Sequence, residues 1–242
     1  MRYELYYWPG IQGRGEFIRL ALEEAGADYI DVARRAESSG KGVPAMLRLM
    51  NDDTVTHPSL APPFLKDGDV IVGQTANILL YLSPKLKLVP DDEALRLWAH
   101  QLQLTVSDLI NEVHDTHHPI ANSLYYKDQK SEAKRRAADF IANRLPKFLG
   151  YFERILARNS DGDQYMVGTA LTYVDLSMFQ VIDGLRYAFP RAMQQAEPDC
   201  PLLAALHQRV QNRPRIARYL ASARRLPFNK EGIFRHYKEL DA

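Results

Sequence analysis

The sequence predicts a mixed α/β region at the amino end of the chain, followed by a region made of helices alone. Residues 3–33 alternate between strand-like and helix-like patterns, whereas beyond residue 90 the apolar side chains keep only a helical spacing. The length of 242 residues suits two domains, and an apolar fraction of 46% can fill a core or two. The expected fold class is therefore an α/β domain plus an all-α domain.

The chain opens with the pattern of a strand, a helix and a second strand. Residues 3–8, Tyr-Glu-Leu-Tyr-Tyr-Trp, have the aromatic content of a strand. Apolar residues within 17–25 then recur at helical spacing, and Gly26 is placed to end that helix in a left-handed conformation. Residues 28–33 alternate like a strand after a connection of helix length, which suits a parallel crossover. These residues predict a βαβ unit.

A hairpin and another helix complete the α/β region. A short helical patch at 45–50 precedes the hairpin. Asp67-Gly68 stands between two apolar runs within residues 62–73, which is a strong hairpin signal. The helix that begins near Gln74 is expected to stop before Pro84, since proline disrupts a helix interior.

Residues 84–90 are the predicted linker, because they contain two prolines and no sustained period. Domains are therefore expected at 1–83 and 91–242. Apolar residues within 95–113 are spaced three or four apart, which predicts a long amphipathic helix. Thr172-Tyr-Val-Asp175 is a candidate capping box with a structural role. Further helices are predicted at about 129–158, 173–188, 201–212 and 214–224.

Charge and cysteine content narrow the classes of function. The chain has 31 basic and 30 acidic residues, so it has no general electrostatic attraction to nucleic acid or to an anionic membrane. Its one cysteine, Cys200, excludes an internal disulfide and is expected to be a buried thiol. The amino terminus lacks the regions of a signal peptide, and no apolar run is long enough to cross a bilayer. A cytoplasmic protein without nucleic-acid or membrane partners is expected.

Four motifs stand out along the chain. They are Tyr7-Trp8 before a Gly-Arg-Gly-Glu helix start, Pro-Phe-Leu-Lys-Asp-Gly at 63–68, Gln-Thr-Ala-Asn-Ile-Leu at 74–79 leading to Tyr81, and Gly-Thr-Ala-Leu-Thr-Tyr-Val-Asp at 168–175. In their order and spacing they resemble the tyrosine-type alpha, mu, pi and sigma classes of the cytosolic glutathione transferase family, over nearly the whole chain. The resemblance implies a thioredoxin-like amino-terminal domain that binds glutathione, an all-helical domain that supplies the pocket for the electrophile, and usually a homodimer.

Tyr7 is the predicted catalytic residue. Family members activate the glutathione thiol with Tyr, Ser or Cys, and no Ser, Cys, Thr or His lies between Trp8 and Arg19. Tyr7 matches the strand tyrosine of the family, whereas Tyr6 should face the other side of the strand. A hydrogen bond to a charged group, worth ~1.5–3 kcal/mol, could lower a thiol pKa of ~8.5 by about two units. Without the resemblance, Tyr7 would be interpreted as a core aromatic residue.

The resemblance also assigns glutathione-binding residues. Gln74 and Thr75 match a Gln-Ser/Thr pair that holds the γ-glutamyl carboxylate at a helix start. An ordinary helix cap would use Thr75 but leave Gln74 unexplained. Pro63 matches the cis-proline of the family. Pro62 before it has no N–H, so only its carbonyl could pair with the backbone of the ligand.

Other parts of the expected glutathione site match the family less well. The family often contributes an acidic side chain across the dimer interface to the amino group of the ligand, and Asp108 is the candidate here. Lys41 and His57 are candidates for holding the glycyl carboxylate. The loop at 9–13 is one residue longer than in the tyrosine-type classes, with Gln12 where Arg is common.

Three histidines lie close together in the sequence, in His114-Asp-Thr-His-His118. On one helix face, residues 114, 117 and 118 would have the spacing of metal ligands. No further ligand group stands out, Pro119 indicates that the helix ends there, and histidines near a helix carboxyl end are favoured by the helix dipole. No metal is therefore expected. By position in the family, Trp8, His114 and His118 should line the electrophile pocket.

The expected function is that of a glutathione transferase active in detoxification. Glutathione would be the co-substrate, and its thiolate would attack a small hydrophobic electrophile. A glutathione-dependent isomerase would use the same site. A non-catalytic binding or scaffold protein with the same fold is the alternative from another class, and Pro62 and the longer loop favour it.

Overall fold

The computed structural model describes residues 2–241, and the chain forms two compact units. One unit holds Met1–Val89 and Arg213–Pro227, and the other holds Pro90–Asn212 and Phe228–Ala242. The sequence-based domain bounds differ from this division mainly in residues 213–227, which were expected in the second domain. They cluster with the first unit because the side chains of Arg213 and Tyr219 bond to carboxylates of the first helix.

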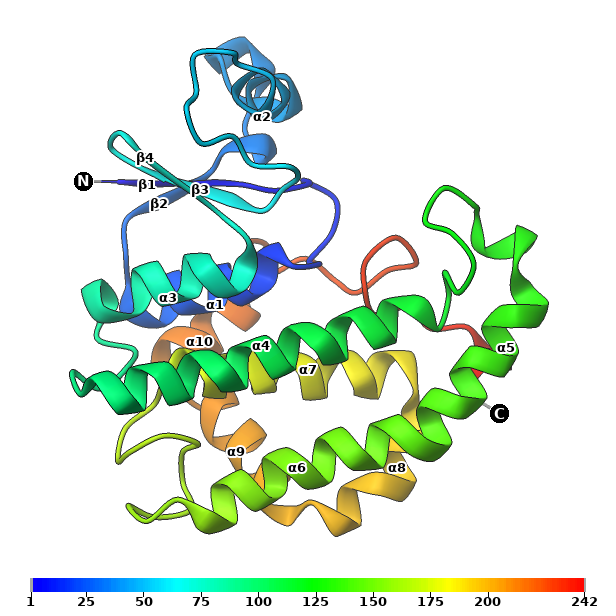
Figure 1. Ribbon diagram of the computed structural model, residues 1–242. Coiled ribbons are helices and arrows are strands. Elements are labelled where there is room, and N and C mark those ends of the chain that lie inside the picture. The colour runs from blue at the N-terminus through cyan, green and yellow to red at the C-terminus, as the bar shows by residue number, and fades with distance from the viewer. Residues whose placement is uncertain (1, 242) are drawn as a thin grey trace. The chain divides into compact units, whose positions relative to one another are not determined.

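The first unit is built on a four-stranded sheet with the order β2-β1-β3-β4. β1 and β2 are parallel, which confirms the βαβ unit, while β3 is antiparallel to both β1 and β4. Figure 1 shows α2 on one face of the sheet and α1 and α3 on the other. The elements are β1 (Tyr3–Tyr6), α1 (Gly15–Ala25), β2 (Tyr29–Asp31), α2 (Gly42–Met50), β3 (Phe64–Asp67), β4 (Val70–Gly73), α3 (Thr75–Leu86) and α10 (Pro214–Leu220).

The alternation of side chains along β1 fills two separate cores. Leu5 packs with Ile18 of α1 and Ile78 of α3 on one face. Tyr6 packs with Met46 of α2 and with Phe64 on the other face. Successive residues of a strand point to opposite faces, so this confirms that Tyr6 faces away from α1 and α3. Tyr7 follows on the face that Leu5 shares.

Two helix ends in the first unit show how local chemistry determines where a helix stops. Gly26 ends α1 with φ 66° and donates its N–H to carbonyls of the last turn, as predicted. The prediction that α3 stops before Pro84 is wrong, because the helix continues to Leu86. Pro84 cannot donate to the carbonyl of Leu80, but the hydroxyl of Ser83 donates to that carbonyl at 3.3 Å, so the helix tolerates the proline.

The second unit is all-helical, as predicted. The long helix α4 spans Glu93–Asp115, and a π-helical turn at Phe140–Arg144 joins α5 to α6 so that 130–158 is nearly continuous. The short helix α8 was not predicted, since seven residues carry too little periodicity. The other helices are α5 (Lys130–Asp139), α6 (Leu145–Arg158), α7 (Tyr173–Ala188), α8 (Pro190–Ala196) and α9 (Pro201–Gln211).

The predicted capping box at the start of α7 is confirmed. Asp175 is fully buried and accepts hydrogen bonds from the N–H and the hydroxyl of Thr172, at 2.7 and 2.8 Å. It also accepts the N–H of Met166 at 2.9 Å, so one carboxylate ties the preceding loop to the helix. Cys200 is a buried free thiol, as expected. Within residues 2–241, no helix combines the length and the apolar content needed to cross a membrane.

Candidate functional site

Three of the predicted site residues lie in a row at one end of the sheet. β1 pairs with β3 so that Tyr6 is opposite Phe64, and β3 pairs with β4 so that Phe64 is opposite Gly73. Continuing both registers by one residue places Tyr7 beside Pro63, and Pro63 beside Gln74. Residues some 70 positions apart in the chain are thus brought to one edge of one unit.

Tyr7 is held with its hydroxyl oriented by the backbone. The residue is 4% exposed, and its hydroxyl oxygen accepts the N–H of Arg14 at 2.9 Å. Burial raises the pKa of Tyr7, although the Arg14 N–H and the charges of Arg14 and Arg19 oppose the rise. The phenol is therefore neutral at neutral pH. Since a hydroxyl can accept and donate at once, its O–H keeps the capacity to donate to a ligand.

Two glycines make room for the Tyr7 ring. A Cβ atom at Gly13 would lie 2.1 Å from the Tyr7 hydroxyl oxygen, and one at Gly15 would lie 2.6 Å from the ring. Gly13 also has φ 46°, a conformation that residues with side chains rarely adopt. The glycine spacing in the loop is thus explained by close packing against Tyr7, which sequence reasoning did not anticipate.

We predict that Gly15→Ala lowers the stability of the protein. At a position with ordinary backbone angles the exchange would normally stabilise by roughly 0.4–1 kcal/mol, but overpacking against the Tyr7 ring costs about 1–3 kcal/mol and should outweigh it. Gly10→Ala is the matched control, because a Cβ atom there meets nothing within 4 Å. Its effect should stay within about 0.5 kcal/mol. Urea unfolding measures both, and a Gly15→Ala protein as stable as the parent would contradict the packing argument.

The backbone of Arg14 connects Tyr7 to the start of α3. Its N–H donates to Tyr7, and its carbonyl accepts the hydroxyl of Thr75 at 3.4 Å. Thr75 is buried, whereas Gln74 is exposed at the N-cap position and makes no side-chain cap bond. The first N–H groups of α3 lack partners within the helix, so this end of α3 suits an anion. Arg14 is a member of the site that sequence reasoning missed, because its contribution is made by backbone atoms.

Gln74 has a strained backbone. Its φ of 67° and ψ of 123° fall in a region that costs a residue with a side chain about 1–3 kcal/mol. An ordinary cap does not require this conformation. The peptide bond between Pro62 and Pro63 is cis, which confirms the match to the cis-proline of the family.

The loop before α1 is fixed by a buried glutamine. Gln12 is 5% exposed, and its side-chain amide donates to the carbonyl of Leu226. Its own carbonyl accepts the N–H of Glu16 at 3.1 Å. The residue that departs from the expected Arg therefore anchors the longer loop inside the first unit. Trp8, at the start of the loop, is 40% exposed.

Two candidates of the first unit stay predictions. Lys41 is half-buried and precedes α2 as its N-cap residue. His57 is exposed and lines a hollow of about 440 Å³ with Asp69, Val70 and neighbouring residues. Val70 pairs with Asp67, at the end of the hairpin remote from Gln74. Nothing in this placement adds support for His57 as a ligand of the glycyl carboxylate.

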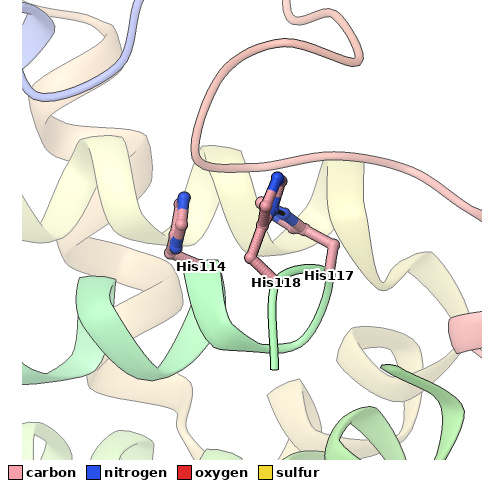
Figure 2. Close-up of side chains that lie close together, drawn as sticks. All are labelled: His114, His117 and His118. Atoms are coloured by element: carbon pink, nitrogen blue, oxygen red, sulfur yellow. Dashed lines mark hydrogen bonds between the residues drawn. The ribbon is translucent and has the colours of Figure 1, made fainter. Parts of the chain in front are cut away.

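The remaining candidates lie in the second unit, on α4 and after it. Asp108 is exposed. The expectation that His114, His117 and His118 share a helix face is wrong, since α4 ends at Asp115 and the latter two lie in the following turn. The turn nevertheless folds the three rings against each other, as Figure 2 shows. His117 is buried, and His114 and His118 are half-buried.

Comparison with known proteins agrees with the motifs. A model of the glutathione S-transferase C-terminal domain matches residues 114–223. A glutathione S-transferase of Plasmodium falciparum (isolate 3D7) is 28% identical over 222 residues, covering 90% of this chain and 94% of that protein. One of Dirofilaria immitis is 28% identical over 241 residues, covering 96% and 99%. Over nearly its whole length the chain is therefore similar to glutathione S-transferases.

The glutathione S-transferase fold is also found by structural comparison. The Pi-class glutathione S-transferase of Onchocerca volvulus superposes with a TM-score of 0.72 at 24% identity, covering 96% of this chain and 99% of the other. At that identity the likeness establishes the fold, a thioredoxin-like unit with a helical unit.

Proposed function

We propose that this protein is a glutathione transferase of the tyrosine type. It binds glutathione, favours the thiolate form of the bound thiol, and lets that sulfur attack a small hydrophobic electrophile. The observation that carries the proposal is that Tyr7, Pro63 and Gln74 each lie one residue beyond the end of a strand at the same edge of the sheet, with the Tyr7 hydroxyl oriented by the Arg14 N–H.

Tyr7 supplies the activating hydrogen bond. The Arg14 N–H occupies one lone pair of the hydroxyl oxygen, and the O–H donates to the glutathione sulfur. Because burial raises the pKa of Tyr7, the phenol stays protonated and acts as a donor rather than as a base. The donor stabilises the thiolate more than the neutral thiol, so the thiol loses its proton at lower pH.

The other residues hold the tripeptide. Gln74, Thr75 and the amino end of α3 bind the γ-glutamyl carboxylate, which the helix dipole favours. The carbonyl of Pro62 accepts a hydrogen bond from the ligand backbone, and cis-Pro63 shapes the chain beside it. Trp8, His114 and His118 are proposed to contact the electrophile, by analogy with the family.

The proposal is tested by retention on immobilised glutathione, followed by a conjugation assay with a generic aromatic electrophile. Retention and turnover are both expected. Gln74→Ala should weaken binding by about 1–3 kcal/mol in calorimetry, since a hydrogen bond to a charged group is lost. Retention without turnover would favour a scaffold protein, turnover confined to isomerisation would favour an isomerase, and absence of retention would overturn the proposal.

A cytoplasmic homodimer is proposed on the basis of the family. Asp108 is the candidate for reaching the amino group of glutathione bound to the partner chain, and it is exposed on α4, as this role needs. Light scattering at micromolar concentration is expected to give the mass of two chains. A monomer mass would remove both the dimer and the role of Asp108.

A further inference from the structure

Three histidines, His114 in the last turn of α4 and His117 and His118 in the turn after it, lie side by side in the second unit (Figure 2). One ring nitrogen from each of His114, His117 and His118 lies within 4.8 Å of the others. The ring centroids form a nearly equilateral triangle, with separations of 5.0, 4.8 and 4.9 Å. We propose that these histidines bind a divalent transition-metal ion of the zinc class. This proposal does not depend on the transferase function. It differs from the expectation drawn from the sequence alone, which was that no metal binds.

The spacing of the rings fits a tetrahedral ion. Zn–N bonds of ~2.0–2.1 Å at tetrahedral angles set ligand nitrogens roughly 3.3 Å apart and ring centroids about 5 Å apart. The Nδ1 atoms of His117 and His118 are 2.6 Å apart and must separate. His114 and His118 are stacked at 18° and must turn so that their lone pairs converge. Both changes are rotations about a soft side-chain torsion, on a backbone that already brings the three rings together.

A hydrogen bond prepares His117 as a ligand. Its Nε2 lies 2.7 Å from the carbonyl oxygen of Ile233, and a carbonyl can only accept, so Nε2 carries the hydrogen. Nδ1 therefore carries the lone pair, and it faces the Nδ1 of His118 at 2.6 Å. Metal-binding histidines are oriented in this way, by donating the other ring N–H to a carbonyl or carboxylate.

The surroundings decide which ions can bind. Three imidazole nitrogens favour Zn²⁺, Cu²⁺ or Ni²⁺ over Mg²⁺ and Ca²⁺, which prefer oxygen ligands. Arg235 is close enough for its positive charge to act on His117 and His118, and this charge opposes a cation. The Asp115 carboxylate, 3.9 Å from His114 Nδ1, offsets part of that charge. His118 lines a hollow of about 700 Å³, which gives an ion access, and three protein ligands leave a fourth position open.

The test uses the full chain without an affinity tag, in buffer free of thiols, glutathione and chelators. Titration with Co²⁺ is expected to give intense visible bands of a four-coordinate ion, and calorimetry with Zn²⁺ should give one ion per chain. His114→Ala and His118→Ala should each lower the affinity for Zn²⁺ by more than about 100-fold. Losing even a residue that hydrogen-bonds to a metal ligand lowers metal affinity by about 10–100-fold, and a ligand itself should matter more. Mg²⁺ should not compete.

His100→Ala is the matched control, because His100 lies on the same helix 14 residues before His114, about 21 Å along its axis. It should bind Zn²⁺ like the parent. His114 and His118 are half-buried, so their variants are expected to keep the parental circular dichroism spectrum. Absence of stoichiometric Zn²⁺ binding by the parent would overturn the proposal, as would parental affinity in the double variant. Conjugation activity is not a readout, so failure here leaves the proposed function untouched.

Discussion

Tyr7→Phe is expected to lower the conjugation rate at neutral pH by roughly ten- to 150-fold, if the lost hydrogen bond is worth ~1.5–3 kcal/mol and thiolate formation limits the rate. Most of the glutathione affinity should remain, because the tripeptide is held mainly by other residues. The conjugation rate, measured with saturating glutathione, gives the size of the effect.

The fold should also survive Tyr7→Phe, at a modest cost. The ring is buried against Gly13 and Gly15, and phenylalanine keeps that packing. The half-buried Arg14 N–H loses the hydroxyl as an acceptor, which removes a hydrogen bond worth about 0.5–1.5 kcal/mol. A small fall of the thermal midpoint is therefore expected together with the large fall in rate. The conjugation rate reports on catalysis and the thermal midpoint reports on stability, so the two roles of the hydroxyl are measured separately.

The dependence on pH distinguishes thiol activation from other roles of Tyr7. In the parent, the bound thiol should have a pKa well below the free value of ~8.5, and in Tyr7→Phe it should rise toward that value. At neutral pH the parent should therefore conjugate faster than Tyr7→Phe. This difference in rate should shrink as the pH rises above about 8.5, where the thiol ionises without help. Thiolate absorbance of bound glutathione against pH measures this directly.

Tyr6→Phe is the control for the Tyr7 variant. The Tyr6 ring stacks on Phe64 with centroids 4.7 Å apart, and its hydroxyl donates to the Glu4 carboxylate at 2.9 Å. It lies on the opposite face of β1, so removing its hydroxyl should leave the rate and the pKa of the thiol almost unchanged. If Tyr6→Phe abolished activity and Tyr7→Phe did not, the other face of the strand would hold the site. If neither variant mattered, a backbone N–H of the loop from Gly10 to Gly13 would become the better donor.

Local patterns in the sequence were sufficient to predict most of the fold. The apolar spacing within 95–113 predicts α4 to within a few residues, and the Asp67-Gly68 turn predicts the hairpin of β3 and β4. Thr172 and Asp175 predict a cap that the structure contains. In each case the residues that fix the structure are neighbours in the chain, so their chemistry can be read without knowing the rest.

Features that depend on distant residues were not predictable in this way. The row of Tyr7, Pro63 and Gln74 depends on the registers of two strand pairs, and sequence reasoning reached these residues only through the family resemblance. Packing of residues 213–227 with the first unit depends on ion pairs across some 190 positions of the chain. The clustering of the three histidines depends on a turn that follows the end of α4.

A buried ion network supports the helix start next to Tyr7. Glu16 on α1 is fully buried and bonds to Arg225 at 2.6 Å and to Arg19 at 3.1 Å. It also accepts the Tyr219 hydroxyl at 2.7 Å, and Arg19 continues the network to Asp31 at 2.6 Å. Arg34 also pairs with Asp31 at 3.7 Å, and the Arg19 guanidinium lies 5.8 Å from the centroid of the Tyr7 ring.

Glu16→Gln is expected to destabilise the protein by about 3–5 kcal/mol, because removing one partner of a buried pair leaves an uncompensated charge. The side chain keeps its size, so the loss reports on charge and hydrogen bonding rather than on volume. At roughly 2–4 °C per kcal/mol for a chain of this length, the thermal midpoint should fall by about 6–20 °C. Differential scanning calorimetry at neutral pH measures the change.

The sign of the pH dependence checks the mechanism of this loss. Burial alone would raise the pKa of Glu16, but the charges of Arg225 and Arg19 outweigh burial and hold it below its ordinary value of 4.5. A carboxylate whose pKa is lowered by folding stabilises the fold above its ordinary pKa. This stabilisation is lost as the pH falls through the folded-state pKa. The gap between parent and Glu16→Gln should therefore be widest at neutral pH and narrow in acid. Asp28→Asn, which breaks the exposed pair with Arg2, should cost no more than about 1 kcal/mol. Equal losses in the two variants would mean that the buried network adds no more than a surface pair.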